Sequence, residues 1–421
     1  MKIERYQAYR NSDIEWLGDV PEHWELSRIK QKGTVRGRVG WKALKADEYV
    51  DEGYIFLSTP NIKEKDIDFE NVNYITYERY VESPEIMLQE GDILLTKDGS
   101  TLGTTNIVSS LPREATVNSS IAVVRFSKEV FKKYIYYQIL SEFIQNKISF
   151  KKSGMGVPHL FQRDINNFFI LLPPLSEQKS IAHYLDTKTV QIDRKIDLLT
   201  QKATLYGKLK QSLINETVTR GLDKSVPMKN SEIEWIGELP ERWEEKRIKD
   251  LSFLQSGNNI TSEQIEDEGE YPVYGGNGLR GYFSKYTNDG DYILIGRQGA
   301  LCGNINYASG KFWATEHAVV VYLKQSVYMK WYGEMLKVIN LNQYSISAAQ
   351  PGLSVERIKR LLLPVPPLCE QKAIADYLDT KTTQFDQIIQ TINTQIEKLK
   401  ELRKTLINDV VTGKIKVTDH Q

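Results

Sequence analysis

Apolar residues recur every three or four positions along two long stretches of the chain, residues 173–222 and 366–413. This spacing places the apolar side chains on one face of an α-helix, and its persistence over many turns is typical of a coiled-coil seam. Each helix has one apolar stripe and needs a partner, and the other helix is the obvious one. A generic helical hairpin would show the same pattern, but the length favours a spacer rod between two domains. The expected seam residues are Ile181, Leu185, Ile192, Ile196, Leu199, Ile374, Leu378, Phe385, Ile389, Ile392 and Ile396.

The two long helices are copies of each other. Residues 173–189 and 366–382 differ at only three of seventeen positions, and both begin with Pro-Pro-Leu. Proline is tolerated in the first turn of a helix, so each helix is expected to begin beside its Pro-Pro pair, with Ser176 as the N-cap of the first. A near-perfect duplication of this kind indicates an internally repeated architecture.

A second pair of segments is also repeated, residues 12–25 and 231–244. Both contain a Trp-(Leu/Ile)-Gly turn, a proline and a second Trp-Glu at the same spacing. We expect both indoles of each copy to pack on a domain or helix, and a binding role for them is the alternative.

The segments between the repeats diverge in side chains but share one plan. In residues 31–172, short apolar runs bounded by turn residues predict strands at 54–57, 92–96 and 120–126, and a helix over 132–146 follows. The segment 250–365 repeats this order loosely. The chain therefore divides into a first β-rich α/β domain (1–172), a first helix (173–222), a second domain (223–365), a second helix (366–413) and a tail (414–421).

Composition excludes several classes of protein. The 421 residues include 55 basic and 55 acidic side chains, so the net charge is zero and the chain is not a uniformly basic nucleic-acid binder. Cys302 and Cys369 lie apart with no Cys-x-x-Cys pair, which indicates a reducing compartment without structural zinc. The sequence shows neither an apolar leader nor a run long enough to span a membrane, so a cytoplasmic location is expected.

No set of residues predicts catalysis. The chain has no phosphate-binding Gly-x-x-x-x-Gly-Lys-(Ser/Thr) motif and no Asn/Asp-Pro-Pro-aromatic motif for amino-methyl transfer, and its five histidines are scattered. Glu177-Gln178-Lys179 and its copy at 370–372 have the spacing of some nuclease sites, but they begin the repeated helices and lack the Pro-Asp strand of such sites. We therefore expect no enzyme activity and no metal in this chain.

Two glycine turns and one basic segment are the candidate DNA contacts. The turns span Gly99–Gly103 and Gly299–Gly303, each after a predicted strand, and the basic segment spans Lys147–His159. Arginine, glutamine and asparagine suit bidentate contacts with base edges, and lysine suits phosphate. A plain backbone turn or a solvated helix end would account for the same residues. The candidates are Lys97, Ser100, Thr101, Lys151, Lys152, His159, Arg297, Gln298, Gln343 and Gln350.

Three features of the chain belong together: the paired Trp-(Leu/Ile)-Gly-x-x-Pro-x-x-Trp-Glu segments, the paired Pro-Pro-Leu-x-Glu-Gln-Lys helices and the divergent domain before each helix. In combination they resemble the specificity subunit of type I restriction-modification systems. The resemblance implies an α+β fold in which two target recognition domains are joined by two long antiparallel helices with a pseudo-twofold internal repeat. It also implies that each domain reads one half of a bipartite, asymmetric sequence in double-stranded DNA.

The same resemblance implies partners. The helices would set the gap between the half-sites and bind two methyltransferase subunits, and restriction subunits with endonuclease and translocase activity would join that core. S-adenosylmethionine, ATP and Mg would then serve those partners, with no cofactor in this chain. A two-domain coiled-coil scaffold or adaptor without a DNA role is the rival interpretation, and it predicts no sequence-dependent binding.

Overall fold

The computed structural model describes residues 4–38, 44–152, 159–233, 235–299, 301–345 and 352–417. The chain forms two compact units, which are Met1–Leu199 with Thr394–Gln421 and Thr200–Asn393. Helices α6 (Leu175–Arg220) and α10 (Leu368–Val411) each contribute one part to each unit. Among the described residues, no helix is long and apolar enough to cross a membrane.

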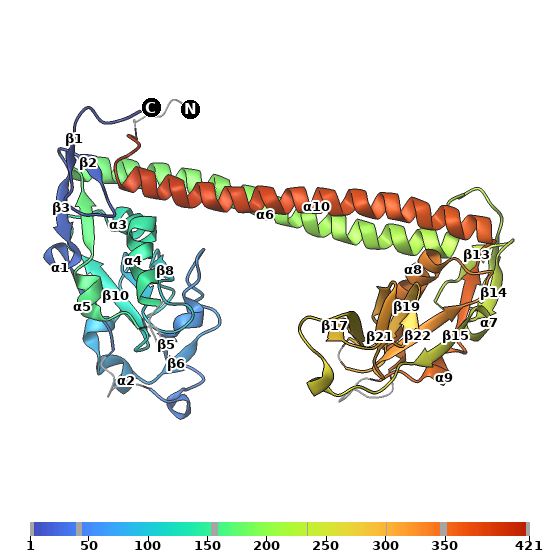
Figure 1. Cartoon of the computed structure of the whole chain (residues 1–421). Helices are drawn as coiled ribbons and strands as arrows, with labels where there is room; N and C mark the ends of the chain where they lie inside the picture. The colour runs from blue at the N-terminus through green and yellow to red at the C-terminus, as the bar shows by residue number, and fades with distance from the viewer. Residues whose placement is uncertain are drawn as a thin grey trace. The chain divides into compact units, whose positions relative to one another are not determined.

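The first unit is built on a four-stranded antiparallel sheet with the strand order β4-β10-β7-β8. Strands β10 and β8 of this sheet are labelled in Figure 1. Strand β10 (Ile121–Phe126) lies between β4 (Gly33–Arg36) and β7 (Ile93–Thr96), and β8 (Thr105–Ile107) lies at the edge. A second sheet has the order β6-β5-β9, in which β5 (Tyr54–Leu57) pairs in parallel with β9 (Ala115–Val117) and antiparallel with β6 (Asn73–Ile75).

Both faces of the main sheet are buried, which explains why its strands read as continuous apolar runs. Successive side chains of a strand point to opposite faces. Accordingly, Ile93 packs in a core with Tyr134 and Ile144 from the helices, while Leu94 packs in a second core with Ile55 of the smaller sheet.

The helix predicted over 132–146 is instead two helices, α3 (Lys132–Leu140) and α4 (Glu142–Lys152). The break is at Ser141, whose backbone is extended and whose hydroxyl donates to the Gln138 carbonyl at 2.6 Å. The Ser141 carbonyl then accepts from the amides of Ile144 and Gln145, so this serine ends one helix and begins the next. Serine favours such end positions because its hydroxyl competes for local backbone groups.

The second unit repeats the plan of the first. Its main sheet has the order β15-β22-β19-β20, formed by Ser252–Ser256, Ala318–Leu323, Tyr292–Gly296 and Ile305–Ala308. Its second sheet has the order β17-β16-β21-β18, and β16 (Tyr271–Gly275) again pairs in parallel with β21 (Lys311–Ala314). Its remaining strands there are β17 (Gly278–Phe283) and β18 (Asn288–Asp289), and its main helix is α8 (Met329–Ile339).

Shorter elements connect these parts. Strand β3 pairs antiparallel with β11, β14 with β23, β1 with β2, and β12 with β13. In the first unit the strands and short helices are β1 (Tyr9–Asn11), β2 (Asp19–Pro21), β3 (Glu25–Arg28), α1 (Ile29–Lys32), η2 (Ala46–Glu48), η3 (Thr59–Asn61), α2 (Tyr77–Val81), η4 (Pro84–Ile86), α5 (Gln162–Asn166) and β11 (Phe169–Leu172). In the second they are β12 (Met228–Asn230), β13 (Glu238–Pro240), β14 (Glu244–Arg247), α7 (Ile248–Leu251), η5 (Ser262–Gln264), η6 (Leu341–Tyr344), α9 (Val355–Ile358) and β23 (Leu362–Val365).

The long helices pair in opposite directions within each unit. In the first unit, Ile181 and Leu185 near the start of α6 share a core with Ile407 and Val410 near the end of α10. In the second unit, Ile214 near the end of α6 shares a core with residues near the start of α10, and Lys210 pairs with Asp386 at 2.6 Å. All predicted seam residues are buried or half-buried.

The predicted N-cap is wrong by two residues. Helix α6 begins at Leu175, and the Pro174 carbonyl accepts from the Gln178 amide at 3.0 Å, so Ser176 already lies inside the first turn.

The two repeated signatures meet at a glutamate in each unit. In the first unit, Trp24 Nε1 donates to Glu177 Oε1 at 3.2 Å, and in the second Trp243 Nε1 donates to Glu370 Oε2 at 3.1 Å. Both of these indoles are fully buried. The expectation was wrong for the other tryptophan of each copy, because Trp16 is 59% exposed and Trp235 is 37% exposed.

The next residue of the repeated motif fixes the shorter helix of each unit. Gln178 Oε1 accepts from the amide of Phe131, the N-cap of α3, at 2.9 Å, and Gln371 Oε1 accepts from the amide of Tyr328, the N-cap of α8, at 2.8 Å. Each glutamine amide also donates to the carbonyl of the first proline of its Pro-Pro pair. The Glu-Gln pair of the motif therefore docks each long helix onto its own domain.

Candidate nucleic-acid interface

Two turns with the same backbone hydrogen bonds follow β7 and β19. In the first turn the Leu102 amide donates to the Gly99 carbonyl at 3.2 Å, and in the second the Cys302 amide donates to the Gly299 carbonyl at 3.0 Å. The amides of Gly103 and Gly303 close the turns onto the last residues of the two strands, at 2.9 and 2.7 Å. The repeated glycine spacing thus encodes one turn geometry, used once in each unit.

The glycine at the end of each turn is required by the backbone. Gly103 and Gly303 have φ values of 93° and 90°, a region that favours glycine. A Cβ on Gly303 would also lie 2.5 Å from the Asn342 amide nitrogen. These glycines therefore shape the turn, and a direct ligand role is not needed to explain them.

A segment from later in the chain joins each turn. The Leu160 amide donates to the Lys97 carbonyl at 2.8 Å, and the Leu353 amide donates to the Arg297 carbonyl at 2.9 Å. Residue pairs Asp98–His159 and Gln298–Gly352 form isolated antiparallel bridges at the same place. The structure thus brings together Lys97 and His159 in the first unit, which lie far apart in the sequence.

In the first unit, the predicted contacts differ in how accessible they are. Ser100 and Thr101 are exposed at the tip of the turn. His159 is ion-paired with Asp98, and its ring centre lies 4.4 Å from that of Phe161. Lys97 is only 8% exposed, and burial lowers the pKa of its ammonium group, with Asp98 opposing that shift. Its burial counts against a phosphate contact.

The basic segment is less available than its sequence indicates. Lys147 is half-buried on α4, with its Nζ 4.4 Å from the centre of the Phe143 ring, and burial lowers its pKa. Lys151 and Lys152 end α4, but their side chains lie outside the described residues, as do residues 153–158.

In the second unit, Gln298 is exposed beside the turn, whereas Arg297 is half-buried with its Nη1 3.3 Å from Ser256 Oγ. Gln343 is exposed on η6, and its side-chain amide donates to the Ile339 carbonyl at 2.6 Å. Gln350 lies outside the described residues.

A hollow of about 500 Å³ adjoins Gln298, and sequence reasoning missed most of it. Its polar lining includes Asn277, Arg280 and His317, which come from the loop after β16, from β17 and from the loop between β21 and β22. The local signal was the glycine-rich run 275–281 with an embedded Asn and Arg. Glycine-rich runs are common in turns, so this run did not identify a binding site without the tertiary fold.

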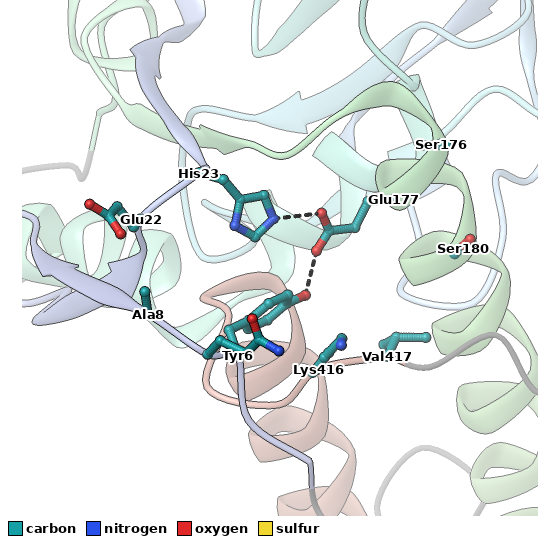
Figure 2. Close-up of a pocket in the computed structure, with 10 residues that line it drawn as sticks. Tyr6, Ala8, Glu22, His23, Ser176, Glu177, Ser180, Lys416 and Val417 are labelled. Carbon is teal, nitrogen blue, oxygen red and sulfur yellow. Dashed lines mark hydrogen bonds and ion pairs between the residues drawn. The ribbon is translucent and has the colours of Figure 1, made fainter.

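Glu177, the first residue of the Glu-Gln-Lys motif in the first unit, lines a different hollow, of about 680 Å³ (Figure 2). Figure 2 shows Tyr6 and His23 pointing toward Glu177. The Tyr6 hydroxyl donates to Glu177 at 2.5 Å and His23 Nε2 lies 3.0 Å from it, so the carboxylate is occupied by structural partners. Burial and the bond to Glu177 raise the pKa of Tyr6. In the described part of the chain, no group of three or more His, Cys, Asp or Glu side chains could hold a metal ion.

The family model for the type I restriction modification DNA specificity domain matches residues 21–204 and 240–398. The chain belongs to this family. It is 35% identical over 231 residues to the EcoprrI specificity subunit of Escherichia coli, a match that covers 54% of each protein. It is 26% identical over 433 residues to the MjaVIII specificity subunit of Methanocaldococcus jannaschii, covering 94% of both. These matches confirm the family resemblance that the two repeated motifs indicated.

Solved structures support the same fold. A chain from a study of assembly and conformational transition of the type I restriction-modification system aligns with a TM-score of 0.73 at 18% identity, covering 93% of this chain and 98% of that one. The HsdS subunit of Thermoanaerobacter tengcongensis aligns with a TM-score of 0.53 at 16% identity, covering 94% and 98%. The expected α+β fold with two similar domains and two long helices is therefore confirmed.

Proposed function

We propose that this chain is the DNA-specificity subunit of a type I restriction-modification complex, in which each recognition domain reads one half of a bipartite DNA target. The observation that carries this proposal is the repeated turn after β7 and β19, with the same backbone bonds but different side chains. A constant backbone with variable exposed side chains is what two different base sequences require. The recognition domains in this proposal span residues 1–172 and 223–365.

In the proposed complex, the long helices set the gap between the half-sites and bind two methyltransferase subunits. An exposed apolar stripe on α6 supports a partner there, because Val190, Leu198, Leu205 and Leu209 are each more than half exposed. At 3.6 residues per turn these four positions fall within about 100° of the helix circumference. Isolated exposed apolar residues are ordinary, but a stripe along one helix face is typical of a protein interface.

The chain takes no catalytic step in this proposal. Methyl transfer from S-adenosylmethionine requires the target base to leave the stack, and that step belongs to the methyltransferase subunits after recognition. ATP-driven translocation and cleavage belong to the restriction subunits. In this proposal, this chain determines the DNA site at which the methyltransferase and restriction subunits act.

The test is to map DNA methylation by long-read sequencing in cells that express this chain together with its methyltransferase, and in cells that express the methyltransferase alone. We expect a new, split and asymmetric methylated motif only when this chain is present. If the two proteins co-purify but no motif appears, the DNA-reading role is wrong for this chain. If they neither co-purify nor methylate DNA, the scaffold interpretation is favoured.

A further inference from the structure

The hollow beside Gln298 in the second unit is formed where three loops converge. They are the loop after β16, the turn after β19 and the loop between β21 and β22. The hollow has a volume of about 500 Å³, and its polar side chains are Asn277, Arg280, Gln298 and His317. These residues therefore form a concave polar surface on the same end of the sheet as the proposed DNA-reading turn.

The walls of this hollow are held by close backbone packing. A Cβ on Gly296 would lie 2.0 Å from the Gly276 carbonyl oxygen, so the strand end and the loop after β16 approach more closely than side chains allow. The Arg297 amide donates to the His317 carbonyl at 2.8 Å, which ties the third loop to the turn. A site with walls of this kind is pre-organised, and pre-organisation lowers the entropic cost of binding.

The polar groups around the hollow are mainly hydrogen-bond donors. Arg280 is exposed, and its stem crosses Gly275, with Cδ 2.5 Å from where a Cβ on that glycine would sit. Gln298 is exposed and has both a donor and an acceptor. His317 Nε2 lies 3.1 Å from Glu316, and its buried Nδ1 has no hydrogen-bond partner among the described residues. An exposed guanidinium and an exposed amide that line one hollow suit a ligand edge that offers acceptors.

We infer that this hollow reads purine edges in the half-site of the second unit, with Arg280 contacting a guanine and Gln298 a neighbouring adenine. Guanine presents the O6 and N7 acceptors in the major groove that arginine binds in a bidentate manner, and glutamine binds the adenine N6 and N7 in the same way. The inference rests on the proposed DNA-specificity role. It goes further by naming the bases and the residues that select them.

The test compares four variants of the full chain, each co-expressed with the methyltransferase and sampled soon after induction. Arg280→Ala and Gln298→Ala remove the proposed contacts, and Arg280→Lys keeps the charge but loses the bidentate geometry. Arg247→Ala is the matched control, because Arg247 is an exposed arginine of the same unit on β14, in a separate sheet. Exchanging residues 31–172 for the segment of another family member identifies which half of the motif belongs to the first unit.

We expect Arg280→Ala to slow methylation of the wild-type motif by about 5- to 150-fold, the usual value of one bidentate base contact. The additional sites that this variant methylates should differ from the wild-type motif at one G·C pair. That pair should lie in the half of the motif that the domain exchange leaves unchanged. Gln298→Ala should relax an A·T pair in that half, and Arg247→Ala should leave the motif unchanged.

Several results would overturn the inference while leaving the proposed function intact. The first is that Arg280→Ala methylates the same motif as the wild-type chain. The second is that Arg280→Ala loses specificity in the half of the motif that the first unit reads. The third is that Arg280→Lys methylates only the wild-type motif. A variant that no longer co-purifies with the methyltransferase is unfolded. In that case Arg280→Lys tests the inference, because lysine keeps the aliphatic stem that packs over Gly275. If the wild-type chain itself directs methylation to no bipartite motif, then the proposed function is wrong, and this inference is wrong with it.

Discussion

The first and second units hold their long helices with the same side chains but present different side chains at their turns. Glu177 and Glu370 each accept from a buried indole, and Gln178 and Gln371 each bond to the N-cap amide of a shorter helix. At the turns, the backbone bonds are again the same in both units. The two units thus share the indole and glutamine contacts that mount each domain, and they differ where a ligand would touch it.

The difference at the turns concerns the hydrogen-bonding groups on offer. In the first unit Asp98 stands where the second has Gln298, and it is ion-paired with His159 on the adjoining segment. In the second unit Gln298 lies beside Gly352 and the polar hollow. A carboxylate only accepts hydrogen bonds when ionised, whereas glutamine and arginine donate. The same backbone turn can therefore present a hydrogen-bond acceptor to one half-site and hydrogen-bond donors to the other.

The largest expected effects come from the buried tryptophans of the shared frame. Trp24→Ala and Trp243→Ala should each lower the free energy of unfolding of their own unit by about 3–5 kcal/mol, because a fully buried indole is lost and a cavity remains. Thermal and denaturant unfolding of the full-length chain would measure both. Similar losses for the two variants are expected if the frames are equivalent.

The matched controls are the exposed tryptophans of the same repeats. Trp16→Ala and Trp235→Ala should change the unfolding free energy much less, with Trp235→Ala the more costly of the two, since Trp235 is less exposed. If Trp16→Ala costs as much as Trp24→Ala, the assignment of separate packing and surface roles to these residues is wrong.

Substitution of the repeated glutamines should lower the free energy of unfolding by a smaller amount, which should be the same in the two units. Gln178→Ala and Gln371→Ala each leave a helix N-cap amide without its acceptor, at about 1–3 kcal/mol. Denaturant unfolding would measure the loss, with the adjoining exposed lysines as controls in Lys179→Ala and Lys372→Ala. A loss in only one unit would show that the two mounts are not equivalent.

The sequence predicts the helices and the repeat well because both can be read without knowledge of tertiary contacts. The apolar period and the Pro-Pro pairs place α6 and α10 within two residues of their ends. The break at Ser141 was missed because serine is compatible with a continuous helix until tertiary packing selects the break.

The candidate site is harder to predict because its residues meet only in the folded chain. Lys97 and His159 are both named by sequence, but their common site depends on the bonds between the turn and a distant segment. Arg280 on β17 and His317 on the loop between β21 and β22 line one hollow with Gln298, and no spacing in the sequence indicates this. The exposure of Trp16 is likewise a tertiary property, since Trp24, the second tryptophan of the same repeat, is buried.

The smallest expected effect concerns Lys97, the one candidate that burial counts against. Each phosphate contact contributes about 0.9 to the slope of log affinity against log salt concentration. Because Lys97 is almost fully covered and burial lowers its pKa, Lys97→Met should leave that slope unchanged when DNA binding by the methyltransferase complex is titrated at several salt concentrations. A slope reduced by about 0.9 would place the ammonium group on a phosphate. The turn of the first unit would then act through charge, in contrast with the base-edge contacts proposed for the second.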